Sequence, residues 1–199
     1  MSWFEELRGR YPVFRYESFE LERSSSQFSA RFKFSIPPDI SFVPEVVFQS
    51  VPEGWHSVSD ESLQNAVFHL GLIESFSYWK ATASPVIEVN AGALTSDQVS
   101  WWEDLLLNGM GEYFFHNKID FTSGNFVRIS AKSNRNAFAL RREPLPPGSL
   151  LTIGGGRDSA LAAALLAGIK RERILNFMPR DELLNWAANL RHNNVRHSN

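Results

Sequence analysis

The sequence predicts an α+β fold. The first part is a mixed domain with antiparallel hairpins and two main helices, and a strand, a glycine loop and a helix follow it. Three observations carry this prediction. Alternating apolar residues mark strands near the start, two long segments in the middle have helical character, and the proline-rich stretch 143–149 separates them from the glycine loop.

The strand prediction begins with residues 28–36, FSARFKFSI, in which apolar and polar residues alternate. A period of two is typical of a half-buried strand. Residues 13–21, VFRYESFEL, have strand composition, and the polar connection after them predicts a hairpin. Pro37, Pro38 and Pro44 confine the next segment to extended or edge structure.

Residues 60–80 form the first predicted helix, because no proline interrupts them. The segment is apolar nearly all round, which predicts a buried helix. Asp60 or Ser62 is expected to cap its N-terminus. On an ideal helix His69 and Lys80 project in nearly the same direction, so the two side chains are expected to line one groove without touching.

Residues 85–92 read as a strand and residues 95–111 as the second helix. Thr95 and Gln98 stand at capping-box spacing, and Gly109 is placed to end the helix. Its two adjacent tryptophans, 101 and 102, are expected in the core rather than as a platform for a sugar.

The remaining segments are less regular. Residues 112–121 fit a helix or a loop, whereas residues 125–131 and 136–142 predict a second hairpin. The linker 143–149 makes a boundary, so we expect one domain over 1–146 and another over 147–199. Near the end, DELLNWAANL can form one more helix and RHNNVRHSN is expected to be a solvated tail.

Composition excludes several classes of function. The chain has 20 basic and 22 acidic residues, closely interspersed, which argues against nucleic acid or an anionic membrane as a partner. An apolar run of about 18 residues and a signal-peptide core are both absent, so we expect a cytoplasmic protein. The absence of cysteine excludes thiolate metal sites, thiol nucleophiles and a two-thiol proton shuttle.

The stretch LLTIGGGRDSALAAALLAG, residues 150–168, places three glycines between an apolar run and a helical segment. Glycines let backbone N–H groups approach an anion, and the helix N-terminus adds the positive end of its dipole. The candidate phosphate-binding residues are Gly154, Gly155, Gly156, Arg157, Asp158 and Ser159. Asp158 is also the candidate ligand for a phosphate-bound magnesium. The alternative is a structural turn in which Asp158 or Ser159 caps the helix.

This loop resembles the pyrophosphate loop S-G-G-x-D-S of the ATP-pyrophosphatase (PP-loop) superfamily. Gly155, Gly156, Asp158 and Ser159 match the pattern, and Gly154 stands where serine is usual. The resemblance implies ATP and Mg²⁺ as cofactors. The chain ends 45 residues after Gly154, so we expect only the first strand, loop and helix of a truncated α/β nucleotide-binding domain. Self-association or a missing C-terminal domain is expected to cover its open edge.

Five stretches carry a second resemblance. They are HLGLIESFSYWKA (69–81), SPVIEVNAGAL (84–94), QVSWW (98–102), GMGEYFFHNKID (109–120) and GGGRDS (154–159). They are similar, in the same order, to the ATP-dependent UDP-N-acetylmuramoyl-L-alanyl-L-glutamate epimerases (MurL) of bacterial peptidoglycan synthesis. The resemblance implies an isomerase that binds UDP-MurNAc-L-Ala-L-Glu and inverts its terminal L-Glu to D-Glu. Adenylation of the glutamyl carboxylate with release of pyrophosphate is implied, followed by hydrolysis that releases AMP.

Polar residues in these stretches are the candidate bases and binders. Lys80 and Glu112 come first, followed by His69 and Glu74 and then by His116 and Asp120. Each has a structural alternative. His69 on a buried helix fits a hydrogen-bonded core histidine, Lys80 at a helix end meets the helix dipole, and Glu112 with His116 fits an ion pair.

Two other hypotheses stay open. One is a different adenylating PP-loop enzyme, such as an amidotransferase-like ligase, which would release AMP without loss of the α-proton. The other is a non-catalytic binding or assembly module, which is favoured if the glycine loop binds no nucleotide.

Overall fold

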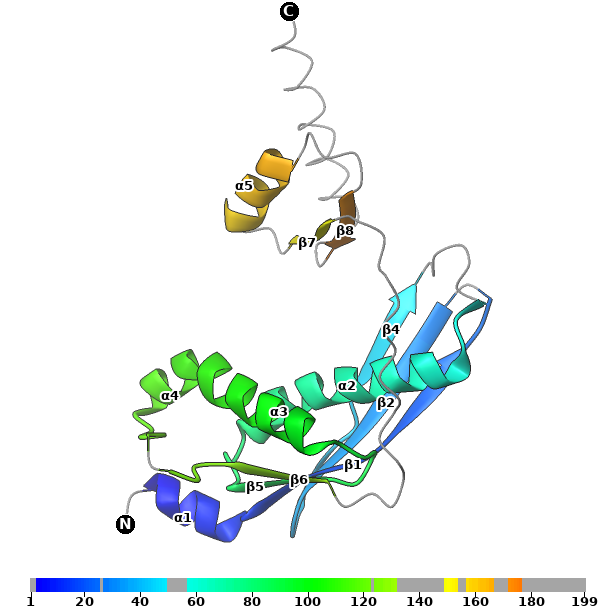
Figure 1. Cartoon of the computed structure of the whole chain (residues 1–199). Coiled ribbons are helices and arrows are strands. Elements are labelled where there is room, and N and C mark those ends of the chain that lie inside the picture. The colour runs from blue at the N-terminus through cyan, green and yellow to red at the C-terminus, as the bar shows by residue number, and fades with distance from the viewer. Residues whose placement is uncertain are drawn as a thin grey trace, which may run out of the picture. The chain divides into compact units, whose positions relative to one another are not determined.

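The computed structural model describes residues 3–25, 27–49, 57–122, 124–131, 149–153, 157–166 and 172–176. The chain divides into two compact units, residues 1–140 and 141–199, and each is considered by itself (Figure 1). The predicted domain boundary after residue 146 lies outside the described residues.

A six-stranded sheet organises the first unit. Its strands are β1 (Val13–Arg23), β2 (Gln27–Ile36), β3 (Ile40–Phe42), β4 (Glu45–Gln49), β5 (Val86–Val89) and β6 (Arg128–Ala131). The order is β3-β2-β1-β5-β6, with β4 also paired to β2. The predicted hairpin is confirmed, because β1 and β2 pair antiparallel.

The other half of the sheet is parallel, which the sequence pattern did not predict. β5 pairs parallel with β1, and β6 pairs parallel with β5. The chain reaches β5 after α2 (Asp60–Trp79) and reaches β6 after α3 (Ser96–Gly109) and α4 (Gly111–Asn117). The expected hairpin partner of β6, residues 136–142, lies outside the described residues.

The helix caps correct one prediction and confirm another. The hydroxyl of Ser59, rather than Asp60 or Ser62, accepts from the backbone of Ser62 and caps α2. Thr95 and Gln98 form the predicted capping box of α3, which ends at Gly109.

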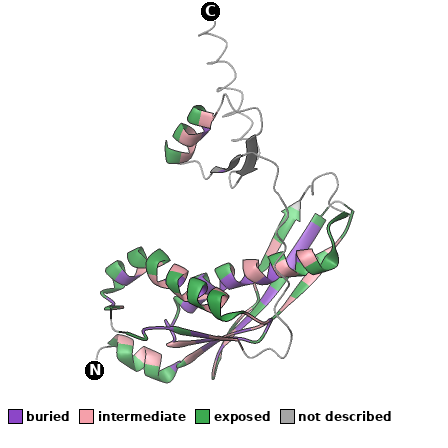
Figure 2. Cartoon of the chain, viewed as in Figure 1, coloured by how far each residue is buried: buried purple, intermediate pink, exposed green. Residues whose placement is uncertain are grey.

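Further differences concern helix number and burial. A short helix, α1 (Trp3–Arg10), precedes β1 and was not predicted. The expectation that residues 60–80 are buried all round is wrong, because α2 buries one face and leaves Ile73 44% exposed. Trp102 is buried as predicted, whereas Trp101 is 57% exposed. Figure 2 shows exposed residues along α3 and α4.

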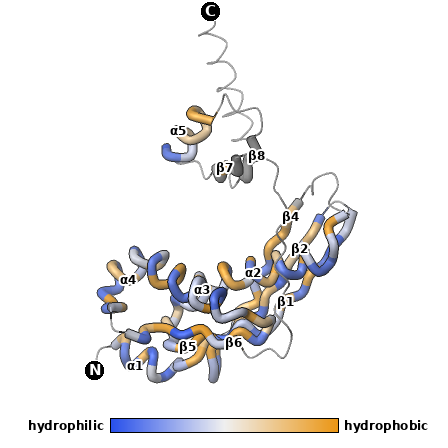
Figure 3. The backbone as a smooth tube through the Cα atoms, in the orientation of Figure 1, coloured by the Kyte–Doolittle hydropathy of each residue, from blue (hydrophilic) through white to orange (hydrophobic). Residues whose placement is uncertain are grey.

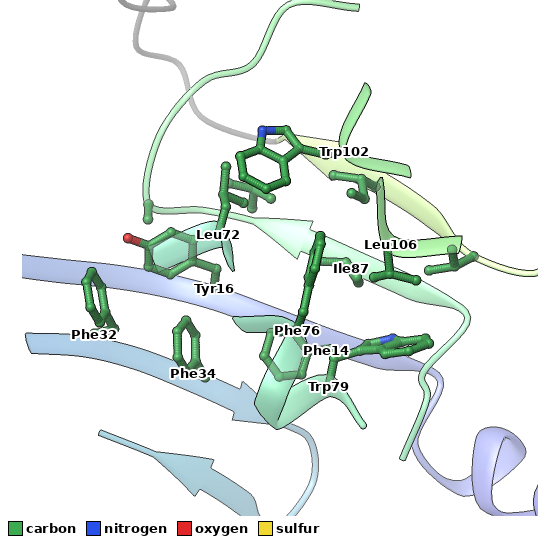
Figure 4. Packing of buried hydrophobic residues seen from close by; sticks show 14 of the residues in the cluster. Phe14, Tyr16, Phe32, Phe34, Leu72, Phe76, Trp79, Ile87, Trp102 and Leu106 are labelled. Carbon is green, nitrogen blue, oxygen red and sulfur yellow. The ribbon is translucent and has the colours of Figure 1, made fainter. Parts of the chain in front are cut away.

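The core fills the space between the sheet and α2. The residues predicted to share one face of β2 are all buried: Phe28, Ala30, Phe32, Phe34 and Ile36. They meet the apolar face of α2 around Tyr16 of β1, whose ring stacks on Phe68 at a centroid distance of 6.0 Å. Figure 4 shows Tyr16, Phe32 and Phe34 packed beside Phe76 and Trp79.

The second unit contains β7 (Ser149–Ile153), α5 (Arg157–Leu166) and β8 (Glu172–Asn176). β7 and β8 pair parallel, so a strand and a helix flank the glycines as predicted. α5 is hydrophilic where it begins and hydrophobic further on (Figure 3). Residues 154–156 and 177–199, and with them most of the glycine loop and the predicted last helix and tail, lie outside the described residues.

Within the described part of the chain, no helix combines the length and the apolar character needed to cross a bilayer.

Candidate functional site

A hydrogen-bonded carboxylate lies where the parallel and antiparallel halves of the sheet meet. The pairing of β1 with β2 shifts register between Tyr16 and Ser18, so Glu17 occupies a bulge. Its two carboxylate oxygens accept from Ser35 Oγ at 2.6 Å and from Asn90 Nδ2 at 2.9 Å. Bulges re-aim side chains and are frequent beside active sites.

Asn90 follows the last residue of β5, so this contact lies at the carboxyl ends of parallel strands. In open α/β sheets, ligands bind outside those ends. The backbone N–H groups of Asn90 and Ala91 donate to the carbonyl of Tyr16 at 2.8 and 3.1 Å. The segment after β5 is therefore held against β1 by backbone and side-chain bonds together.

Glu17 is ionised at neutral pH. Partial burial raises the pKa of its carboxyl, but the hydrogen bonds from Ser35 and Asn90, with the nearby cations Arg15 and Lys33, outweigh burial and lower that pKa. This carboxylate is a stable hydrogen-bond acceptor and a weak base.

A hollow of about 520 Å³ adjoins this cluster, and we call it the edge hollow. Its lining is Glu17, Ser18, Phe19, Leu21, Arg23, Asp60, Gln64, Asn90 and Ala91. Beyond Tyr16, β1 has no strand partner on this side among the described residues. Arg23 donates to Val58 O at 3.2 Å and to Asp60 at 3.3 Å. An open strand edge with polar side chains around it is suited to an extended polar ligand.

His69, the candidate base on α2, lies half-buried between aromatic rings. Its imidazole stacks on Trp102 with a centroid distance of 5.8 Å and meets the edge of Phe68 at 5.1 Å. Burial lowers the pKa of His69, so the ring is neutral at pH 7. A neutral imidazole can accept a proton, and it also packs as an ordinary core side chain.

Lys80 is the C-cap residue of α2 and is exposed. The hydroxyl of Tyr113 on α4 donates to the carbonyl of Lys80 at 2.9 Å, which holds α4 against the end of α2. Residues 112–117, which the sequence left open, are helical, and Glu112 lies 3.7 Å from His116 one turn on. Both side chains are largely exposed. Glu74 is half-buried on α2.

Asp120 lies in a second hollow, of about 690 Å³, which we call the terminal hollow. Its lining is Trp3, Phe4, Glu5, Arg8, Asn117, Lys118, Ile119, Asp120, Asn125 and Phe126. Asp120 accepts from the backbone and the hydroxyl of Thr122 at 2.9 and 2.6 Å, and these bonds lower its pKa.

Neither of these two hollows brings the predicted bases together. His69, Glu74, Lys80 and Glu112 line neither hollow, and their catalytic roles stay predictions. Sequence reasoning missed Glu17, because alternation along β1 marks it as an ordinary solvent-facing residue. Asn90 lies within the family-like stretch 84–94, and that was the available signal.

In the second unit, Arg157 and Asp158 occupy the exposed first turn of α5, directly after the glycine loop. This chemistry fits a nucleotide phosphate, because a guanidinium pairs with phosphate oxygens and a carboxylate holds a phosphate-bound Mg²⁺. The residues present are therefore compatible with the predicted ATP and magnesium. Among the residues that the structure describes, no cluster of three acidic or histidine side chains could hold a metal by itself.

The fold and these features define an α+β protein in two units, with a polar cluster at a strand bulge in the first and a parallel strand–helix–strand unit in the second. The chain belongs to the MurL N-terminal domain family, whose model matches residues 5–194. The UDP-N-acetyl-alpha-D-muramoyl-L-alanyl-L-glutamate epimerase of Xanthomonas oryzae pv. oryzae (strain MAFF 311018) is a relative, 22% identical over 188 residues. The alignment covers 94% of this chain and 40% of the relative, so the chain spans less than half of that protein's length. No solved structure matches the chain.

Proposed function

We propose that this chain is the N-terminal part of an ATP-dependent epimerase of peptidoglycan precursor synthesis. It would convert the terminal L-Glu of UDP-MurNAc-L-Ala-L-Glu to D-Glu. One observation carries the proposal: 94% of the chain aligns with a protein whose name states that epimerase activity. The family match runs through both units, so the glycine loop lies inside the matched region.

The chemistry explains why a phosphate-binding unit accompanies the first unit. Removing the α-proton beside an ionised carboxylate would build a second negative charge next to the first. Transfer of AMP from ATP to that carboxylate releases pyrophosphate and neutralises the charge, so the carbonyl can accept the electron pair. A base then takes the α-proton, and a proton delivered to the opposite face inverts the centre. Hydrolysis of the mixed anhydride releases the D-Glu product and AMP.

In this proposal residues 154–159 bind the phosphates, and Asp158 holds magnesium. His69 is the candidate base whose ionisation fits proton removal, because it is neutral at pH 7. Lys80 and Glu112 are exposed on neighbouring elements and remain candidates for delivering the proton. Glu74 is the further candidate.

Solvent exchange tests the proposal. The chain, alone and within a protein of the relative's full length, is incubated in D₂O with UDP-MurNAc-L-Ala-L-Glu, ATP and magnesium. We expect AMP, D-Glu and deuterium at the glutamyl α-carbon from the longer form. Asp158→Asn should abolish AMP release, whereas the matched Asp97→Asn, also in a first helical turn, should not.

The other outcomes identify the alternatives. AMP without deuterium would contradict epimerisation and favour a different adenylating enzyme. Neither product from the longer form would favour a binding or assembly module. If the His69→Gln variant still releases AMP but no longer incorporates deuterium, His69 is the base that removes the α-proton. An unchanged exchange rate in this variant would exclude His69 from that role.

A further inference from the structure

The terminal hollow has features that the proposed reaction does not use. α1 supplies one wall, the residues after α4 supply the second, and Asn125 with Phe126 closes the third. At about 690 Å³ the hollow has the size of a small-ligand site. It lies in the first unit, on elements distinct from the glycine loop.

Lys118 in this hollow adopts an unfavourable backbone conformation. Its φ of 54° and ψ of 41° are left-handed, a conformation in which glycine or asparagine is usual after a helix. The backbone N–H of Lys118 donates to the carbonyls of Phe114 and Phe115, which ends α4. Glycine would serve this turn at lower backbone cost, so the turn does not require lysine, although a cation at this helix end interacts favourably with the dipole of α4. No ion pair of Lys118 is found within the described part of the chain.

An aromatic surface stands beside this cation. Trp3 is 67% exposed and stacks on Phe4 with an interplanar angle of 14°, and Phe4 stacks on Phe126 at 7°. The guanidinium of Arg8 lies 4.2 Å from the centroid of Phe126, which braces this stack. An exposed indole on a braced stack is a platform for a planar ring, and base–aromatic stacking is a strong contact in nucleotide binding.

Of the two cationic side chains that line the terminal hollow, one is held by the fold and the other is able to contact a ligand. Arg8 donates to the carbonyls of Ala83 and Phe126, so its guanidinium serves the fold. Lys118 is therefore the cation left for an anionic ligand. Asp120 and Glu5 carry the negative charges of the hollow, and carboxylates accept hydrogen bonds from ribose hydroxyls in nucleotide sites.

We propose that the terminal hollow binds the nucleoside diphosphate end of the substrate. The base stacks on Trp3, the ribose hydroxyls donate to Asp120, and Lys118 contacts the phosphate oxygens. The inference rests on the proposed function for the identity of the nucleotide, which is then uridine diphosphate. That proposal places ATP at the glycine loop, so UDP binding is assigned to the hollow by substitutions of the hollow's own residues.

Calorimetric titration of the whole chain with UDP tests the inference. Lys118→Gly removes the ammonium and relieves the left-handed strain, so loss of binding cannot be blamed on unfolding. We expect it to raise the Kd for UDP about tenfold while leaving thermal stability equal or higher, and Lys118→Arg to preserve binding. Lys33→Gln is the matched control for charge, since Lys33 is exposed on β2.

Trp3→Ala tests the platform, with Phe115→Ala as control because Phe115 is 80% exposed on α4. We expect Trp3→Ala to weaken UDP about tenfold and Phe115→Ala to leave the affinity unchanged. UDP binding that is unaffected by Lys118→Gly and Trp3→Ala, or no binding of UDP, would overturn the inference.

These results are separable from the proposed function. UDP binding at the hollow without deuterium exchange in the longer protein would uphold the site and reject the epimerase. Deuterium exchange in the longer protein without UDP binding at the hollow would support the epimerase and reject the proposed site.

Discussion

Gly71 lets α2 approach β1, and Gly71→Ala should be strongly destabilising. A Cβ at this position would lie 2.2 Å from the hydroxyl oxygen of Tyr16, 2.5 Å from its Cζ and 2.8 Å from Cδ1 of Phe32. Both aromatic side chains are fully buried, so neither can swing into solvent. Figure 4 shows how closely Tyr16 and Phe32 are packed.

Two opposing effects set the magnitude. Alanine is favoured over glycine inside a helix by about 1 kcal/mol. Overpacking a close-packed core costs about 1–3 kcal/mol and occasionally more, and three contacts under 3.0 Å place Gly71 at or above the top of that range. We therefore expect a net loss of about 2 kcal/mol, which lowers the melting temperature by about 4–8 °C in a chain of this size.

Urea unfolding followed by near-ultraviolet circular dichroism measures the effect. Gly109→Ala is the matched control, since its Cβ would meet nothing within 4 Å, and it should be neutral or slightly stabilising. The Tyr16 hydroxyl has no hydrogen-bond partner among the described residues. Tyr16→Phe should therefore cost little and should recover part of the loss in the double variant. If the Gly71→Ala variant proved as stable as the parent protein, the close approach of α2 to β1 at Gly71 would be refuted.

The remaining predictions concern a cap and a titration. Thr95→Ala should destabilise the chain by about 1 kcal/mol through loss of the α3 capping box, while Ser96→Ala one residue on should be neutral in the same urea assay. Burial lowers the pKa of His69 below its unfolded value of about 6.5, so the unfolded state binds more protons. The contribution of His69 to stability should therefore be complete above that pH and decline as pH falls below it. His69→Gln should reduce this decline, and an unchanged slope in that variant would contradict the assignment.

Elements whose signals are local followed from the sequence. The alternation in residues 28–36 predicted β2 and its buried face, because a strand turns successive side chains to opposite sides. The capping box of α3 was predicted for a similar reason. The side chains of Thr95 and Gln98, three residues apart, each accept a hydrogen bond from the backbone N–H of the other. The uninterrupted apolar content of residues 60–80 correctly predicted a helix but wrongly predicted that all of its faces are buried. Which face is buried depends on how the helix packs against the sheet.

The candidate site residues also differ in whether neighbouring residues alone reveal them. The glycine loop and the candidate phosphate-binding residues Arg157 and Asp158 were visible in the sequence, because these residues are nearly consecutive. Glu17 and Asn90 were not, since 73 residues separate two side chains that meet only when β5 pairs with β1. The left-handed Lys118 was equally hidden, because a backbone angle is chosen by the turn it closes.

The sequence by itself therefore determined the main helices, the first hairpin, the glycine loop and the family resemblance, all of which are carried by neighbouring residues. Tertiary structure alone decided the parallel half of the sheet, the bulge at Glu17, the edge hollow and the terminal hollow. Each of these depends on contacts between segments far apart along the chain. Such contacts form only after the core has brought those segments together.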